Sequence, residues 1–369
     1  MKSLKLLALV LIVVSVFGIW PGALGDCPAN GSMSVRGPVP TSPATLPTYP
    51  RSPFEPEGTK NNVLDDTSLS QFSSPAVWQE QTLPNDPFLK QQWALTKIKA
   101  PVLWRVTTGV RGGLVAVLDT GIDQDHEDLV GNVVAEVNFT DSPTCRDVYG
   151  HGTHVAGIIA ARCNNEIGIA GVAPESQLMN VKVADDRGEC RAIAVASGIM
   201  WAVEHGASVI NISLELAEPS VELENAINYA WSQGAVVIAA AGNDGSVLPA
   251  YPARYKNSIA VAAIRQDDTL APLSNHGYWL DVAAPGFNIY SLLPGDKYGY
   301  KSGTSFAAAY VSGLAAQFYG IVTDRNGDNR INDEVREIIE TGCQEIGLTG
   351  TGKGCIDAAN SLANIDHDR

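Results

Sequence analysis

The chain has 369 residues, of which 45% are hydrophobic and 18% charged, so it can bury a large core. This composition excludes a wholly disordered chain, a collagen-like chain and a small protein held together only by disulfides. The formal net charge of −15 argues against a nucleic-acid partner, because phosphate binding needs a basic surface.

The first 25 residues have the pattern of a secretory signal peptide. Lys2 and Lys5 precede an apolar run at 6–20, and small residues follow at 23–25. The run is shorter than the ~20 residues that a membrane-spanning helix needs. We therefore expect a secreted protein with no membrane contact after signal cleavage; an uncleaved signal would instead retain it at the cell surface.

Export changes the interpretation of the six cysteines, because disulfides persist outside the cytosol. The sequence alone does not determine the connectivity. Cys343 and Cys355 are close in sequence and are candidates for a disulfide, as are Cys145 and Cys190. Cys163 is expected to be a free, buried thiol.

Residues 26–84 differ in composition from the rest of the chain. Eight of the 21 prolines fall within 26–56, mixed with Ser, Thr and Gly, and 57–84 is polar and weakly patterned. Such a stretch is typical of an extended linker. We predict a pro-segment or linker at 26–84, followed by one catalytic domain at 85–369.

The domain alternates short apolar runs with helical patterns. Strands are predicted at 114–118, 178–183, 207–212, 235–241 and 258–263, and helices at 153–161, 191–205, 219–233 and 304–319. This order predicts an α/β fold of three layers, with a mostly parallel central sheet and helices on both faces. In such sheets ligands bind beyond the carboxyl ends of the strands.

Four polar residues stand where chemistry is expected: Asp119 after the first strand, His151 at a helix start, Asn243 between glycines and Ser305 opening an Ala-rich helix. Each also has an ordinary structural interpretation, as a turn, a structural histidine or a helix cap. Zinc is disfavoured because His151 and His154 lack the HExxH arrangement and a nearby acidic ligand. Together, the four residues predict acyl transfer by a serine activated by an imidazole and a carboxylate.

The motifs Asp-Thr-Gly at 119–121, His-Gly-Thr-His at 151–154, Ala-Ala-Gly-Asn at 240–243 and Gly-Thr-Ser at 303–305 closely resemble those of subtilisin-like serine proteases (subtilases), most of all the thermitase branch. The resemblance covers about 85–365. It implies a three-layer subtilisin-like fold and a secreted, monomeric endopeptidase acting on polypeptides, with Ser305 as nucleophile, His151 as general base and Asp119 orienting it. Asn243 and the Ser305 backbone N–H would form the oxyanion hole.

The resemblance also implies calcium, Ca²⁺, bound by side chains and backbone carbonyls. The implied side-chain ligands are Asp86, Asp128 and Asn165, and the implied carbonyl ligands are those of Cys163, Ile167 and Ile169. The alternative is a surface loop without calcium.

A second acidic stretch superficially resembles a calcium loop of the EF-hand type, with Asp324, Asn326 and Asp328 as candidate ligands. Position twelve is Val335 instead of an acidic ligand, and position six is Asn329 instead of Gly. A solvated helix–helix connection, with Asn332 or Asp333 capping the next helix, is the alternative.

The chain departs from the family pattern near the substrate. Phe306 and Ala309 replace the usual Met and Pro after the nucleophile, and Glu215 and Leu216 replace two glycines of the cleft. The implied substrate-binding residues are Ser213, Leu214, Glu215, Ala241, Gly242 and Asp244. Glu215 and Asp244 either narrow the cleft or favour a basic residue before the cleaved bond. Alternatives to a general endopeptidase are a narrow processing enzyme or peptide ligase, and a surface binding module with little turnover.

Overall fold

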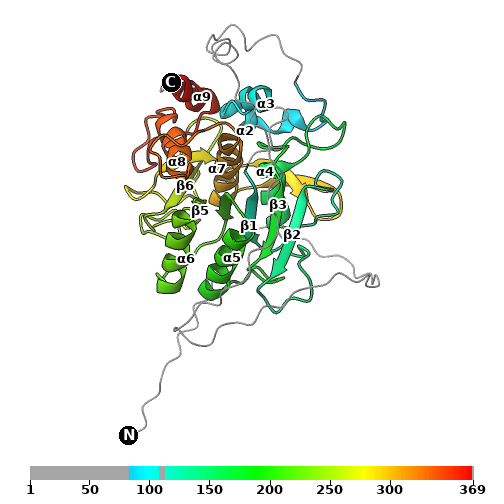
Figure 1. Ribbon diagram of the computed structural model, residues 1–369. Helices are drawn as coiled ribbons and strands as arrows, with labels where there is room; N and C mark the ends of the chain where they lie inside the picture. The colour runs from blue at the N-terminus through cyan, green and yellow to red at the C-terminus, as the bar shows by residue number, and fades with distance from the viewer. Residues whose placement is uncertain (1–82, 108–112, 368–369) are drawn as a thin grey trace.

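The computed structural model describes residues 83–107 and 113–367 (Figure 1). The predicted signal peptide, Cys27 and the 26–84 segment up to residue 82 lie outside the described residues. No helix within the described ranges is both long enough and apolar enough to cross a membrane.

The centre of the domain is a seven-stranded parallel sheet, ordered β2-β3-β1-β4-β5-β6-β7. Its strands are β1 (Val115–Asp119), β2 (Val133–Asn138), β3 (Leu178–Lys182), β4 (Val209–Ile212), β5 (Val236–Ala240), β6 (Ser258–Ile264) and β7 (Val282–Pro285). A separate antiparallel hairpin is formed by β8 (Ile289–Leu293) and β9 (Lys297–Lys301). The five strands predicted from apolar runs are all present and fully buried, as expected when helices cover both faces.

Helices cover the two faces of this sheet (Figure 1). They are η2 (Leu89–Gln91), α2 (Trp93–Lys97), α3 (Pro101–Val106), α4 (Gly152–Ala160), α5 (Ala192–Glu204), α6 (Val221–Ser232), α7 (Thr304–Tyr319), α8 (Asn332–Thr341) and α9 (Ala358–His367). Alternate residues of β1 enter two separate cores: Val115 and Val117 pack with α4 and α7, whereas Ala116 and Leu118 pack with α5 and α6. The predicted three-layer architecture is therefore confirmed.

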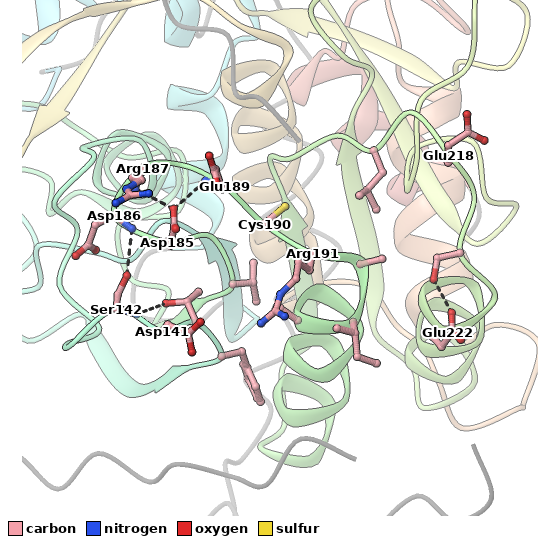
Figure 2. A pocket seen from close by; sticks show the side chains of 18 of the residues that line it. Asp141, Ser142, Asp185, Asp186, Arg187, Glu189, Cys190, Arg191, Glu218 and Glu222 are labelled. Carbon is pink, nitrogen blue, oxygen red and sulfur yellow. Dashed lines mark hydrogen bonds between the residues drawn. The ribbon is translucent and has the colours of Figure 1, made fainter. Parts of the chain in front are cut away.

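A pocket of about 1030 Å³ opens beyond the carboxyl ends of β2, β3 and β4 (Figure 2). The segments that line it are 139–143, 183–194 and 216–222. Figure 2 shows that several carboxylates line it, including Asp141, Asp185, Glu189 and Glu218, and apolar residues such as Leu216 contribute to the lining as well. The pocket therefore lies at the edge where parallel sheets bind ligands.

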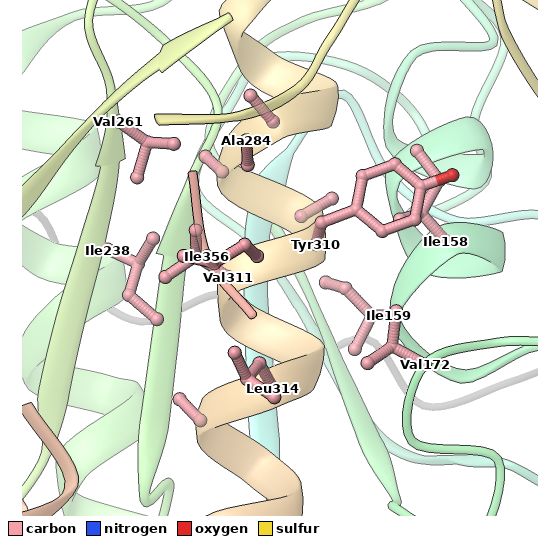
Figure 3. Packing of buried hydrophobic residues seen from close by; sticks show 14 of the residues in the cluster. Ile158, Ile159, Val172, Ile238, Val261, Ala284, Tyr310, Val311, Leu314 and Ile356 are labelled. Carbon is pink, nitrogen blue, oxygen red and sulfur yellow. The ribbon is translucent and has the colours of Figure 1, made fainter. Parts of the chain in front are cut away.

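The helix α7 is the most deeply buried element near this edge. Tyr310 extends from α7 toward Ile158 of α4, while Ile238 of β5 and Val261 of β6 lie on the other side of the helix (Figure 3). Burying a large apolar side chain stabilises a fold by about 1.5–3 kcal/mol. This packing fixes the first turn of α7, which carries Ser305.

The prediction of disulfides is contradicted by the structure. The cysteines of the described ranges (Cys145, Cys163, Cys190, Cys343 and Cys355) are free thiols. The thiols of Cys343 and Cys355 are directed to different backbone carbonyls, those of Ile339 at 3.2 Å and Ile356 at 3.5 Å. Burial raises the pKa of the Cys145 thiol to about 11 and that of the Cys190 thiol to about 12, so these sulfurs stay protonated.

Candidate active site

Asp119 and His151 form a buried hydrogen-bonded pair. The His151 Nδ1 atom lies 2.7 Å from Asp119 Oδ1, and the two side chains are 1% and 0% exposed. A carboxylate at this distance holds the proton on Nδ1, which leaves the Nε2 lone pair free to accept another proton. Asp119 ends β1 and His151 directly precedes α4, so sheet and helix together set this geometry.

Asp147, which the sequence analysis missed, organises the start of α4. Its Oδ2 atom accepts the backbone N–H of Thr153 at 2.8 Å and the Thr153 hydroxyl at 2.7 Å, while Oδ1 accepts the N–H of Gly150 and the Thr120 hydroxyl. These bonds satisfy helix N–H groups that have no intrahelical partner. The acidic residue four positions before His151 was the available sequence signal.

Ser305 is the second residue of α7 and is held against the segment that follows β4. Its hydroxyl donates to the Ser213 carbonyl at 3.0 Å, and the Ser213 hydroxyl donates back to the Ser305 carbonyl at 2.9 Å. The ring of the next residue, Phe306, lies 5.4 Å from the His151 ring, centroid to centroid. The first turn of α7 therefore stands beside the imidazole, while the Ser305 hydroxyl is bonded to the Ser213 carbonyl.

Asn243 follows β5 and is oriented by Thr304, a second residue that the sequence analysis missed. The Asn243 Oδ1 atom accepts the Thr304 backbone N–H at 2.8 Å and the Thr304 hydroxyl at 3.2 Å. The oxygen is thereby occupied, and the Nδ2 group is left as a donor. Because Thr304 immediately precedes Ser305, the carboxamide is tied to the same helix turn as the serine.

Glu215 lies on the other side of Asn243. Its Oε2 atom accepts the Asn243 backbone N–H at 2.9 Å, and burial together with the nearby Asp244 raises the pKa of Glu215 to about 7. A Cβ at Gly242 would collide with this carboxylate, and Gly242 has a φ of +104°. Glycine at 242 is therefore required both by the backbone conformation and by the position of Glu215.

Two more of the predicted substrate-binding residues, Leu214 and Ala241, adjoin Glu215 and Gly242 in the chain. Leu214 and Ala241 are buried, and the Ala241 carbonyl accepts Asn275 Nδ2 at 3.0 Å. Asn275 Oδ1 accepts the N–H groups of Asp244 and Ser246, so it closes the loop after Asn243. No pattern in the sequence singled out Asn275.

The first predicted calcium site brings its residues together. Asn165 donates its backbone N–H to Asp86 Oδ1 at 3.4 Å and its Nδ2 group to Asp128 Oδ1 at 3.0 Å. Both aspartates are buried, neither pairs with Lys or Arg within the described ranges, and burial raises the pKa of each. The carbonyls of Cys163, Ile167 and Ile169 accept no hydrogen bond from the described part of the chain.

The second predicted calcium loop is closed by its own hydrogen bonds. Asp324 accepts the N–H groups of Gly327 and Asn329 at 2.7 and 2.8 Å, and Asp328 pairs with Arg330 at 3.2 Å. Asn329 has a φ of +66°, so it adopts the conformation for which a calcium loop uses glycine. Within 83–107 and 113–367, no three His, Cys, Asp or Glu side chains are gathered as a metal site. Calcium at Asp324, Asn326 and Asp328 stays a prediction.

The model of the subtilase family matches residues 111–342 of this chain. The chain is 43% identical over 283 residues to thermitase of Thermoactinomyces vulgaris, a match that covers 76% of this chain and 99% of that protein. It is 42% identical over 293 residues to the thermophilic serine proteinase of Bacillus sp. (strain AK1), covering 79% and 70%. Among solved structures, a protease from Pseudoalteromonas arctica PAMC 21717 superimposes with a TM-score of 0.69 and 31% identity, covering 77% of this chain and all of that one.

Proposed function

This chain belongs to the subtilase family and is a subtilisin-like serine protease, and we propose that it hydrolyses peptide bonds through Asp119, His151 and Ser305. The observation that carries the proposal is the buried 2.7 Å bond between Asp119 and His151 beside the first turn of α7. It supplies an imidazole with a free Nε2 lone pair beside Phe306, the residue that follows Ser305 in α7.

In the acylation step, the Ser305 Oγ atom attacks the peptide carbonyl carbon and its proton passes to His151 Nε2. The carbonyl oxygen becomes an oxyanion. As the C–N bond breaks, His151 returns the proton to the leaving amine, and an acyl-enzyme remains on Ser305. Water then attacks the ester, giving its proton to His151, and the Ser305 hydroxyl re-forms as the carboxylic acid leaves.

The oxyanion requires donors that are in place before the reaction. Asn243 Nδ2 is available because its Oδ1 atom is held by Thr304. The Ser305 backbone N–H lies in the first turn of α7, where N–H groups lack intrahelical acceptors. These two donors support the assignment of the oxyanion hole to Asn243 and Ser305.

We expect fluorophosphonate to label Ser305, since the reagent reacts with an activated serine. The wild-type chain should become labelled at Ser305, as located by peptide mass analysis, whereas Ser305→Ala should stay unlabelled. Ser213→Ala is the matched control, because it removes a neighbouring hydroxyl and leaves the nucleophile. A folded wild-type chain that takes up no label would contradict the proposal.

We also propose that the enzyme is secreted by its signal peptide and acts as a monomer on polypeptides. Residues 1–25 support export, and the similarity to named serine proteinases supports polypeptide substrates. The acidic charge of the whole chain gives no support to nucleic-acid binding.

Calcium is proposed at the first site, where the donor set fits. Two buried carboxylates without a cationic partner, one carboxamide and three free carbonyls supply the oxygen ligands that Ca²⁺ prefers. Asp86, Asp128 and Asn165 would hold the ion with the carbonyls of Cys163, Ile167 and Ile169. The ion would offset the cost of burying the two negative charges.

Removing calcium is expected to lower the melting temperature by about 5–11 °C. An ion at 100 times its Kd stabilises a fold by about 2.7 kcal/mol, and each kcal/mol corresponds to about 2–4 °C in a domain of 150–250 residues. Calorimetry of Ser305→Ala, with calcium and with a chelator, measures the shift without autolysis. Adding Asp128→Asn should abolish the shift, whereas adding Glu127→Gln, an adjacent exposed acid, should preserve it. An unchanged melting temperature in chelator would refute the calcium proposal.

A further inference from the structure

Glu215 and Asp244 place two carboxylates on either side of Asn243 with no cation to balance them. Neither forms an ion pair within the described ranges of the chain. Asp244 is exposed, whereas Glu215 is partly buried and its hydrogen-bond donor is the neutral N–H of Asn243. An anion that is removed from water without a counter-charge costs free energy that a cationic ligand recovers.

The position of Glu215 is fixed relative to the reacting groups. Two residues before it, the Ser213 carbonyl accepts a hydrogen bond from the Ser305 hydroxyl. The Glu215 carboxylate itself accepts a hydrogen bond from the Asn243 backbone N–H. The attacked carbonyl must lie between Ser305 Oγ and the Asn243 carboxamide. The side chain of the residue that supplies this carbonyl is therefore held between the 213–215 and 241–243 segments, next to Glu215.

The Glu215 carboxylate is directed onto the backbone beside the reacting groups by its bond to the Asn243 N–H. Its Oε2 atom occupies the space that a side chain at residue 242 would need, which only glycine leaves free. Burial raises the pKa of this carboxyl to about 7, and the charged group that adds to the effect is Asp244. A guanidinium or ammonium group beside it would favour the ionised form.

We propose that Glu215, assisted by Asp244, selects substrates with arginine or lysine at the residue that supplies the attacked carbonyl. This inference rests on the proposed peptidase function and names its substrate class. The charged side chain lies against Glu215, and the polypeptide backbone places its carbonyl at Ser305. Asn243 keeps its backbone bond to the carboxylate throughout.

The test compares two peptides that differ only by arginine or citrulline at that residue. Citrulline has nearly the same shape and no charge, so the ratio of the two kcat/KM values isolates the charge. We expect a ratio of about 10 or more, the size of a hydrogen bond between charged groups. Glu215→Gln, which keeps an acceptor for the Asn243 N–H, should remove most of the preference, and Asp244→Asn should remove a smaller part of it.

A control variant removes an acid outside the cleft. Glu224 lies on the exposed face of α6, and Glu224→Gln should leave the ratio of the two kcat/KM values unchanged. Raising the pH through about 7 should increase the ratio in the wild type and not in Glu215→Gln, because only the wild type ionises at residue 215. The ratio cancels any effect of pH on the shared catalytic step, which affects both peptides equally.

The outcomes separate this inference from the proposed function. A wild-type chain that is labelled by fluorophosphonate but cleaves both peptides equally would overturn the role of Glu215 and leave the peptidase intact. So would a preference that keeps its wild-type size in Glu215→Gln. A chain that is neither labelled nor active on either peptide would instead overturn the peptidase proposal itself.

Discussion

Replacing His151 with alanine is expected to lower kcat by about 10⁶-fold. The magnitude is that of subtilisin, a relative of this chain, where removing the serine or the histidine alone costs about as much as removing the whole triad. The physical reason is that the Ser305 hydroxyl is a weak nucleophile until a base takes its proton. In this chain the base is held by a carboxylate 2.7 Å away and buried beside α7, so no solvent group replaces it readily.

The decisive measurement is the double variant. If His151 and Ser305 act as one unit, adding Ser305→Ala to His151→Ala should lower kcat hardly further, although each change alone is severe. His205→Ala is the control, because His205 is exposed and stacks on Trp201 far along the chain from the site. Independent, multiplicative losses from the two variants would show that the imidazole does not act on the Ser305 hydroxyl.

Much of the fold was predictable because the central strands are buried on both faces. Their apolar runs identified β1, β3, β4, β5 and β6 to within one or two residues. The edge strand β2 was missed because its residues are only partly buried and its pattern is mixed. The hairpin of β8 and β9 was missed as well, since the sequence Lys-Tyr-Gly-Tyr-Lys at 297–301 gives neither an apolar run nor clean alternation.

Site residues were predictable from the sequence where they lie at the carboxyl ends of strands. Asp119 and Asn243 were found because they directly follow buried strands, and the sheet brings such positions to one edge. The supporting bonds were not predictable. Asn243 is hydrogen-bonded to Thr304 and to Glu215, which lie 61 and 28 residues away in the sequence. No local sequence pattern encodes such a pairing.

The disulfide prediction failed for a related reason. An exported chain with an even number of cysteines can form disulfides. Whether two cysteines pair depends on the distance between their sulfurs and on the direction of each side chain. Gln344, the neighbour of Cys343, forms an isolated antiparallel β-bridge with Cys355, yet the thiols of Cys343 and Cys355 face separate carbonyls. Sequence separation carries no information on that orientation.

Replacing Asp119 with asparagine is expected to lower kcat by about 10⁴-fold, the loss seen for the equivalent change in a Ser-His-Asp triad. Asparagine has nearly the same shape, and the Thr120 N–H that donates to Asp119 Oδ1 at 2.7 Å can still bond its carboxamide oxygen. The same Oδ1 atom also faces His151 Nδ1, so the carboxamide offers the imidazole either a neutral acceptor or, if it flips, an Nδ2 donor. A neutral acceptor no longer stabilises the imidazolium, and an Nδ2 donor holds the ring proton on Nε2, where the ring can no longer take the proton of Ser305.

A weakened base predicts more than a loss of rate. Because the defect lies in the base, raising the pH should partly restore kcat in Asp119→Asn, as hydroxide becomes able to deprotonate Ser305, whereas the wild type should show no such hydroxide-dependent rise. Asp357→Asn, a buried carboxylate that pairs with Lys99 and does not touch the imidazole, is the matched control and should retain the wild-type profile. If Asp119→Asn instead kept wild-type kcat at neutral pH, the Asp119–His151 bond would have no part in catalysis.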